Sequence, residues 1–235
     1  MKTRLDQVRG KIAAALLRSG RTAGRVQLLA VSKHQPFSAV LEAWNAGQTL
    51  FAESYAQELV TRLADVKARP ELSSTTTPLQ FDFVGRLQGN KVKTVVGACR
   101  MLHSIDRFSI ADAVNRQAER FGVIQSVLMQ VNISGEETKS GVRVEDAPRL
   151  LEELLRLPGL HVEGLMSFGR YVPPDAPYEM RAREFIDMVQ LRDSLAGRFE
   201  APLAQLSMGV SHDYEVAVEQ GATIVRVGAG IFGPR

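Results

Sequence analysis

Eight short apolar segments are spaced along this sequence, and each except the last is followed by a stretch with helical periodicity. The first, residues 26–31, is almost continuously apolar, which is typical of a strand that is buried on both faces of a sheet. Strands that alternate with helices indicate a parallel sheet. The predicted strands cover residues 26–31, 49–52, 79–84, 101–105, 126–133, 161–168, 205–210 and 223–227.

The helical stretches between these strands carry recognisable end signals. One begins at Pro36 and ends before Gly47, and proline is favoured at the start of a helix and glycine after its end. The first twenty residues place Leu5, Val8 and Ile12 on one helical face, so an extra helix is predicted before the first strand. The predicted helices after the first strand cover residues 36–46, 55–67, 91–99, a stretch ending at 120, 147–157, 178–199 and 214–219.

Eight strand–helix units in a chain of 235 residues are typical of a (β/α)8 barrel near the small end of its size range. The sequence therefore predicts an α/β protein with a single TIM-type barrel domain over residues 1–235 and an extra N-terminal helix. An open, doubly wound parallel sheet would show the same alternation of strands and helices. That alternative stays open on the pattern alone.

Charge and cysteine content limit the binding partners and the cellular compartment that we expect. The net charge of +3 comes from 29 basic and 26 acidic residues, and no run of like charge occurs, so we do not expect a nucleic-acid partner. Cys99 is the single cysteine, which fits a reducing compartment. No signal-peptide core or transmembrane stretch is visible. We expect a cytoplasmic protein without a membrane partner.

The carboxyl ends of the strands form the active face of a TIM-type barrel, and a lysine follows the first predicted strand. Burial near the barrel mouth and the proximity of Arg226 are expected to lower the pKa of Lys33, which makes its amine a nucleophile for aldehydes. The alternative is that Lys33 begins a solvated loop. Other groups expected at this face belong to Ser54, Met166, Ser207, Met208, Arg226, Gly228 and Ala229.

Two glycine-containing segments, residues 207–209 and 228–230, lie at the ends of the last two predicted strands. Barrels often bind phosphate at this position through backbone N–H groups, and Ser207 adds a hydroxyl donor. The alternative is that these glycines only allow tight turns. No metal site is predicted, because His34, His103, His161 and His212 do not share the spacing of metal ligands.

Several ordered blocks of residues carry a resemblance to a known family. On these blocks the sequence resembles the pyridoxal phosphate homeostasis proteins (the YggS/PROSC family), which are similar to the N-terminal barrel of alanine racemase, a fold-type III pyridoxal phosphate enzyme. The resemblance covers nearly the whole chain. The blocks are residues 29–33, 51–58, 83–91, 139–141, 164–166, 206–213 and 225–233.

The resemblance implies that Lys33 carries pyridoxal 5′-phosphate (PLP) as a Schiff base and that Arg226 faces the pyridine nitrogen. Ser54 and Met166 then become candidates for further cofactor contacts. A permanently charged arginine beside the ring nitrogen disfavours its protonation, so the ring would be a weak electron sink. The phosphate-binding groups that the resemblance implies belong to Ser207, Met208, Gly228 and Ala229.

Three departures from the family pattern affect the expected affinity for PLP. The family commonly has Gly-Glu-Asn where this chain has Ala52-Glu53-Ser54, so a shorter hydroxyl replaces an amide. It commonly has Trp-His where this chain has Phe81-Asp82. A threonine or serine is usual where Ala229 stands, so one hydroxyl contact to phosphate is expected to be lost.

Three functions are compatible with these residues. The resemblance implies PLP homeostasis, in which the protein stores PLP and supplies it to apo PLP-dependent enzymes without robust turnover. Alanine racemase uses an acid on a further β-domain, and we do not expect one in this sequence, which ends directly after the eighth predicted strand. The alternatives are an amino-acid racemase that uses Lys33 with an acid such as Tyr55, and a PLP-independent Schiff-base aldolase.

Overall fold

Eight parallel strands close into a barrel in the computed structural model, which describes residues 1–21, 26–72 and 76–233. Each strand pairs in parallel with the next, and β9 pairs with β1, so the sheet has no free edge within this ring. The predicted barrel is confirmed and the open sheet is rejected. The strands of the ring are β1 (Gln27–Val31), β2 (Leu50–Glu53), β3 (Gln80–Phe83), β4 (Met101–Ile105), β5 (Gln125–Asn132), β7 (Leu160–Ser167), β8 (Gln205–Ser207) and β9 (Ile224–Val227).

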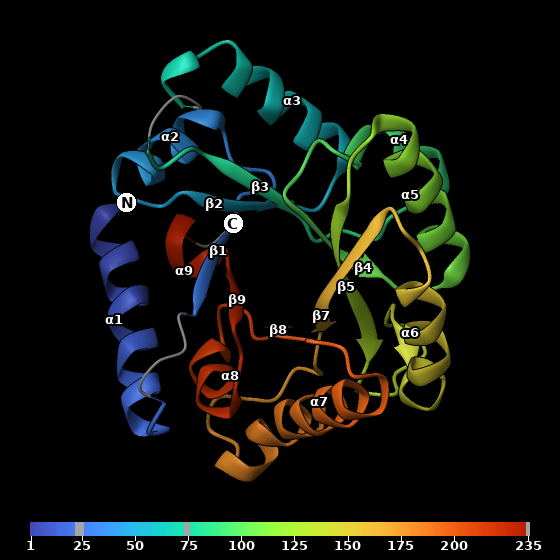
Figure 1. Cartoon of the computed structure of the whole chain (residues 1–235). Coiled ribbons are helices and arrows are strands. Elements are labelled where there is room, and N and C mark those ends of the chain that lie inside the picture. The colour runs from blue at the N-terminus through green and yellow to red at the C-terminus, as the bar shows by residue number, and fades with distance from the viewer. Residues whose placement is uncertain (22–25, 73–75, 234–235) are drawn as a thin grey trace.

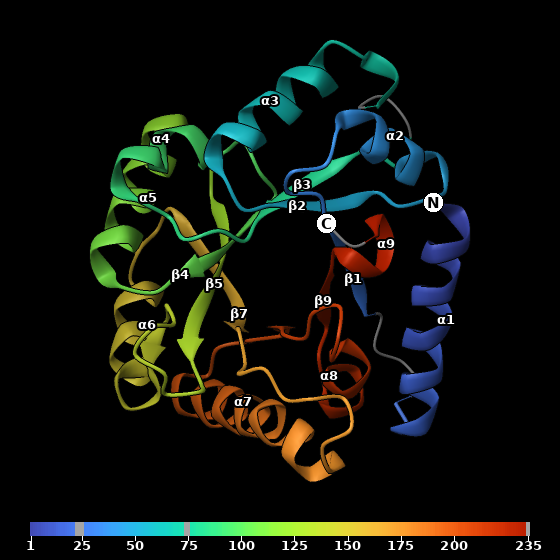
Figure 2. The same ribbon diagram turned by 180° about the vertical axis from the view of Figure 1, so that it is seen from behind.

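Helices surround the strands on the outside of the barrel (Figures 1 and 2). The predicted N-terminal helix is present as α1, which packs beside α8 and α9. No helix of the described residues is long and apolar enough to cross a membrane. The helices are α1 (Lys2–Arg18), α2 (Phe37–Asn45), α3 (Ala56–Lys67), α4 (Val92–Val95), α5 (Phe108–Phe121), α6 (Ala147–Leu155), α7 (Tyr178–Phe199), α8 (Tyr214–Gln220) and α9 (Ala229–Phe232), with 3-10 turns at Pro70–Leu72, Gly89–Lys91 and Val144–Asp146.

The structure differs from the predicted elements in a few places. The helix predicted over residues 91–99 is only the four residues of α4, because Val96 is extended and Gly97 has a φ of +70°. A two-residue strand, β6 (Val142–Arg143), pairs with the end of β5 and was not predicted. The short helix α9 was also missed, since a Gly-Ala-Gly segment has no helical periodicity.

Two apolar clusters explain why the strands are apolar on both faces. The larger cluster lies between the strands and the surrounding helices. The smaller one includes Leu29, Ala52, Met101, Met166 and Ile224, which belong to different strands of the ring and face its interior. Alternate residues of each strand therefore pack inward and outward, as in other filled barrels.

Candidate functional site

A cavity of about 180 Å³ opens at the carboxyl ends of β1, β2 and β9, the face where the sequence predicted a site. Five of the eight predicted residues line it. Two apolar residues, Val31 and Val84, also contribute to its wall. The complete lining is Val31, Lys33, Ser54, Val84, Phe168, Val210, Ser211, Arg226, Gly228 and Ala229.

Lys33 lies in the turn that follows β1 and is half-buried at the cavity wall. The next residue, His34, has a φ of +62°, and its half-exposed imidazole pairs with Glu58 at 3.0 Å. The His34 ring also stacks on Tyr55, with 5.0 Å between ring centroids. The chain therefore presents the lysine to the cavity and the histidine to the neighbouring helix α3.

Close approach of β2 and β3 shapes this side of the cavity. A Cβ atom at Gly85 would lie 1.9 Å from the carbonyl oxygen of Ser54, so only glycine fits beside it. Ser54 is half-buried and lines the cavity directly after β2. Gly85, which follows β3, thus allows the serine to lie at the wall.

Arg226, on β9, also lines the cavity and is almost fully buried, with 2% of its surface exposed. Its Nη1 donates to Ser207 Oγ at 2.6 Å and its Nη2 donates to the Ser167 carbonyl at 2.7 Å. The guanidinium also packs on the Phe168 ring, 4.5 Å from the centroid. Within the described residues, Arg226 Nε is buried and has no hydrogen-bond partner. Burial lowers the pKa of Arg226 to about 10.

The other three predicted residues lie away from this cavity. Ser207 ends β8, Met208 follows it, and both are fully buried. The Met208 N–H donates to the Ile224 carbonyl at 3.1 Å. Met166 packs inside the barrel. The described residues that line the cavity include none of these three. The predicted strand over residues 205–210 ends early, at Ser207, so the groups that reach the cavity come from later in this segment.

Ser211 is the polar residue of the described cavity lining that the sequence interpretation missed. Its hydroxyl oxygen accepts hydrogen bonds from the N–H groups of Gly228 at 3.1 Å and Gly230 at 3.5 Å. An oxygen atom is thereby held against the backbone turn that follows β9, where phosphate binding was predicted. Gly209, with a positive φ of +84°, turns the chain between β8 and Ser211, and that glycine was the available signal in the sequence.

A polar chain, formed by the hydrogen-bonded side chains of Ser207, His103, Asp82 and Arg100, crosses the barrel interior behind Arg226. Ser207 Oγ lies 3.0 Å from His103 Nδ1, and His103 Nε2 lies 3.0 Å from Asp82 Oδ2. Arg100 donates to both carboxylate oxygens of Asp82, at 2.8 and 2.6 Å. Burial raises the pKa of Asp82, but the bonds from His103 and Arg100 outweigh it and hold that pKa below its ordinary value. Burial lowers the pKa of His103 despite its Asp82 partner.

A second buried carboxyl group belongs to Glu53, the last residue of β2, and its side chain lies between this strand and helix α3. Its Oε1 accepts from Ser32 Oγ at 2.7 Å and from Arg62 Nε at 3.0 Å. Its Oε2 is buried and has no partner among the described residues. Burial, with a smaller contribution from the neighbouring Glu58, raises the pKa of Glu53 to about 7 against the lowering effect of Ser32 and Arg62.

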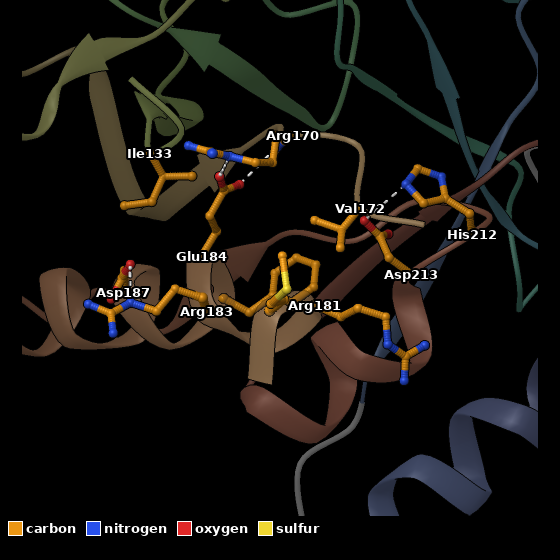
Figure 3. A pocket seen from close by; sticks show the side chains of 12 residues that line it. Ile133, Arg170, Val172, Arg181, Arg183, Glu184, Asp187, His212 and Asp213 are labelled. Carbon is orange, nitrogen blue, oxygen red and sulfur yellow. Dashed lines mark hydrogen bonds and ion pairs between the residues drawn. The ribbon is translucent and has the colours of Figure 1, made fainter. Parts of the chain in front are cut away.

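A larger cavity of about 310 Å³ lies between α7, the segment after β7 and the start of α8 (Figure 3). Most of its charged side chains already form ion pairs with one another. Arg170 pairs with Glu184 at 2.6 Å, Arg183 with Asp187 at 3.2 Å and His212 with Asp213 at 3.3 Å. Its described lining contains no predicted site residue, so we take the smaller cavity as the candidate site.

No metal centre competes with this assignment in the described part of the chain. No three His, Cys, Asp or Glu side chains there are arranged to hold a metal ion. Cys99 is buried, and its thiol donates to the Val95 carbonyl at 3.4 Å.

The fold and the site together define a class of protein, the alanine racemase-type barrel. The model of the family described as "Alanine racemase, N-terminal domain" matches residues 9–235. Among solved structures, alanine racemase of Clostridium difficile in complex with cycloserine is 12% identical, with a TM-score of 0.70 over 96% of this chain and 60% of that chain. At that identity the likeness concerns the fold alone.

Relatives of higher identity place the chain more narrowly. The "Pyridoxal phosphate homeostasis protein" of Aquifex aeolicus is 40% identical over 99% of this chain and 97% of its own length, and that of Escherichia coli K12 is 40% identical over 98% and 95%. The structure of PipY from Synechococcus elongatus PCC7942 with PLP bound is 31% identical, covers 94% and 100%, and has a TM-score of 0.79. The chain belongs to the pyridoxal phosphate homeostasis protein family.

Proposed function

We propose that this chain binds PLP at the cavity around Lys33 and serves to store and supply it in the cytoplasm. The observation that carries the proposal is the buried Nε–H of Arg226, which has no partner among the described residues. A buried donor without an acceptor costs about 1–3 kcal/mol, and a pyridine nitrogen would accept its hydrogen. The name of the relatives and the PLP-bound structure of PipY support the same ligand.

The other cavity groups fit the remaining parts of PLP. PLP supplies an aldehyde, with which a primary amine condenses and releases water, and Lys33 is the primary amine of the lining. The Ala229 N–H and the Ser211 hydroxyl, whose oxygen the Gly228 and Gly230 N–H groups hold in place, would bind the phosphate. Ser54 lines the same cavity as Lys33. In this assignment Ser207 supports Arg226 and does not touch the phosphate.

The chemistry of the lining favours a carrier over a racemase. Racemisation needs groups that exchange protons on both faces of the cofactor. Apart from Lys33 and Arg226, the described residues that line the cavity have no ionisable side chain other than serine hydroxyls. Tyr55, the acid considered from the sequence, is 51% exposed and stacks on His34. Arg226 beside the ring nitrogen also keeps the ring a weak electron sink.

Two substitutions test the binding site directly. Borohydride treatment of the PLP-loaded protein should leave a pyridoxyl group on Lys33, found by peptide mapping, and Lys33→Ala should abolish the absorbance band of the bound cofactor. Arg226→Ala should weaken PLP binding tenfold or more, as loss of a charge-assisted hydrogen bond implies. A full band in Lys33→Ala, or an unchanged dissociation constant in Arg226→Ala, contradicts the assignment.

PLP transfer and amino-acid racemisation distinguish a carrier from an enzyme. The loaded protein should restore activity to an apo-aminotransferase, our proposed kind of recipient, while chiral chromatography after long incubation with alanine or serine should detect no racemisation. Racemisation that disappears in Lys33→Ala would favour the racemase. A colourless protein that binds a sugar phosphate would favour the aldolase.

A further inference from the structure

The polar chain inside the barrel connects the cavity to the opposite end of the molecule. Arg100 directly precedes β4, and it lies beside Gln80 and Leu50, which begin β3 and β2. From there the contacts pass through Asp82, His103 and Ser207 to the guanidinium at the cavity. Asp82, His103 and Ser207 are completely buried, so each polar atom depends on its neighbour in the chain.

The direction of every hydrogen bond follows from the two charged ends. Asp82 is a carboxylate and only accepts, so His103 donates to it from Nε2. The neutral ring then presents Nδ1 as an acceptor, and the Ser207 hydroxyl donates to it. The oxygen lone pairs of Ser207 are thereby turned toward Arg226 Nη1. The lowered pKa of His103 agrees with a neutral ring.

We propose that Asp82 is a positioning residue for the cofactor: through His103 and Ser207 it fixes the guanidinium of Arg226 so that Nε faces the ring nitrogen. This inference rests on the proposed function. Ser207 holds Nη1 and the Ser167 carbonyl holds Nη2, so the planar guanidinium cannot rotate without breaking a bond. The remaining nitrogen, Nε, is the one without a partner among the described residues.

A purely structural role explains Asp82 poorly. An apolar side chain of similar volume usually stabilises a protein interior as well as a buried ion pair does, or better. Asp82 pairs in register with Ala52, whose side chain belongs to the apolar interior cluster, so an apolar residue there would join that cluster. The carboxylate instead fixes the proton on His103, and a fixed proton sets the orientation of every later group in the chain.

PLP titrations of four proteins test this route. They are the wild type, Asp82→Asn, Ser207→Ala and the double variant. Each single substitution should weaken binding about three- to tenfold, the size of one hydrogen bond. The double variant should bind as weakly as Ser207→Ala and no more weakly, because Asp82 acts through Ser207. The matched control is Asp106→Asn, which removes a carboxylate whose partner is the adjacent Arg107 and should leave binding unchanged.

Each outcome has a definite meaning. Effects that multiply in the double variant would overturn the inference, because Asp82 would then act by another route. A wild type that does not bind PLP refutes the proposed function, whereas a wild type that binds and an Asp82→Asn variant with the same dissociation constant refute the positioning role alone. If Asp82→Asn does not fold, nitrogen NMR of wild-type His103 decides. We expect a neutral ring with its proton on Nε2, and a proton on Nδ1 would contradict the inference.

Discussion

Two buried carboxyl groups on neighbouring strands face opposite sides of the barrel wall, and their pKa values are shifted in opposite directions. Asp82 pairs in register with Ala52, and Glu53 is the next residue along β2, so one carboxylate points into the barrel and the other toward α3. Asp82 receives bonds at both oxygens and has a lowered pKa. Glu53 has one oxygen without a partner among the described residues and a pKa raised to about 7.

The difference shows how burial and hydrogen bonding decide the charge of the same chemical group. Both side chains are completely shielded from solvent, so both lose the hydration that favours the charged form. Three donor contacts offset this loss at Asp82, whereas the contacts of Ser32 and Arg62 with one oxygen do not offset it at Glu53. A satisfied carboxylate can fix the geometry of its neighbours, and a partly satisfied one can take up a proton instead.

The largest expected effect comes from removing Arg100, the charged partner of Asp82. Arg100→Met should lower the free energy of unfolding by about 3 kcal/mol, the lower end of the range for breaking a buried ion pair, because 27% of the Arg100 side chain is exposed. Ser32→Ala, which removes a partner of Glu53, should cost only about 1 kcal/mol, because Glu53 responds by taking up a proton. Urea unfolding near neutral pH measures both.

An exposed ion pair provides the control for this comparison. Arg149 lies 3.4 Å from Glu153 on α6 and its side chain is 83% exposed, so Arg149→Met should change the free energy of unfolding by no more than about 0.5 kcal/mol. Equal losses in Arg100→Met and Ser32→Ala would show that the two carboxylates do not differ as described.

Glu53 and His103 should make the stability of the protein depend on pH. The folded state holds the Glu53 proton up to about pH 7, whereas an unfolded glutamate loses it near 4.5, so this group makes stability fall as pH rises between these values. The lowered pKa of His103 acts in the opposite direction: below about 6.5 the unfolded state binds more protons, and stability rises with pH. In the wild type the two contributions oppose each other.

Glu53→Gln should remove the contribution of Glu53 and leave that of His103. The variant should gain stability as pH rises toward 6.5, with a slope of up to about 1.4 kcal/mol per pH unit from a single titrating group. Unfolding free energies at several pH values between 5 and 8, compared with those of the wild type, measure the change in slope. Parallel curves for the two proteins would mean that Glu53 is ionised throughout this range.

The barrel could be predicted from the sequence because its strands are apolar on both faces and alternate with helices. Side-chain connections across the barrel could not. Ser207 was expected at the phosphate because it lies near the end of a strand, yet its hydroxyl bonds Arg226 and His103. His103 carried no metal-ligand spacing, and its role depends on contacts with residues 21 and 104 positions away. Hydrophobic periodicity and helix-end residues report local structure, whereas these contacts form only when the barrel closes.

The smallest effect is expected at the cavity residues proposed to bind phosphate, which contact neither Asp82 nor Glu53. Ser211→Ala should weaken PLP binding by about 0.5–1.5 kcal/mol, the net contribution of one hydrogen bond. Ala229→Thr should strengthen it by a similar or smaller amount, because a hydroxyl is added beside the same backbone N–H groups. Combined with Asp82→Asn, the Ser211→Ala effect should be additive, since the two residues share no partner. Titrations of the single and double variants measure this, and strong coupling would mean that the phosphate end and the barrel interior respond as one unit.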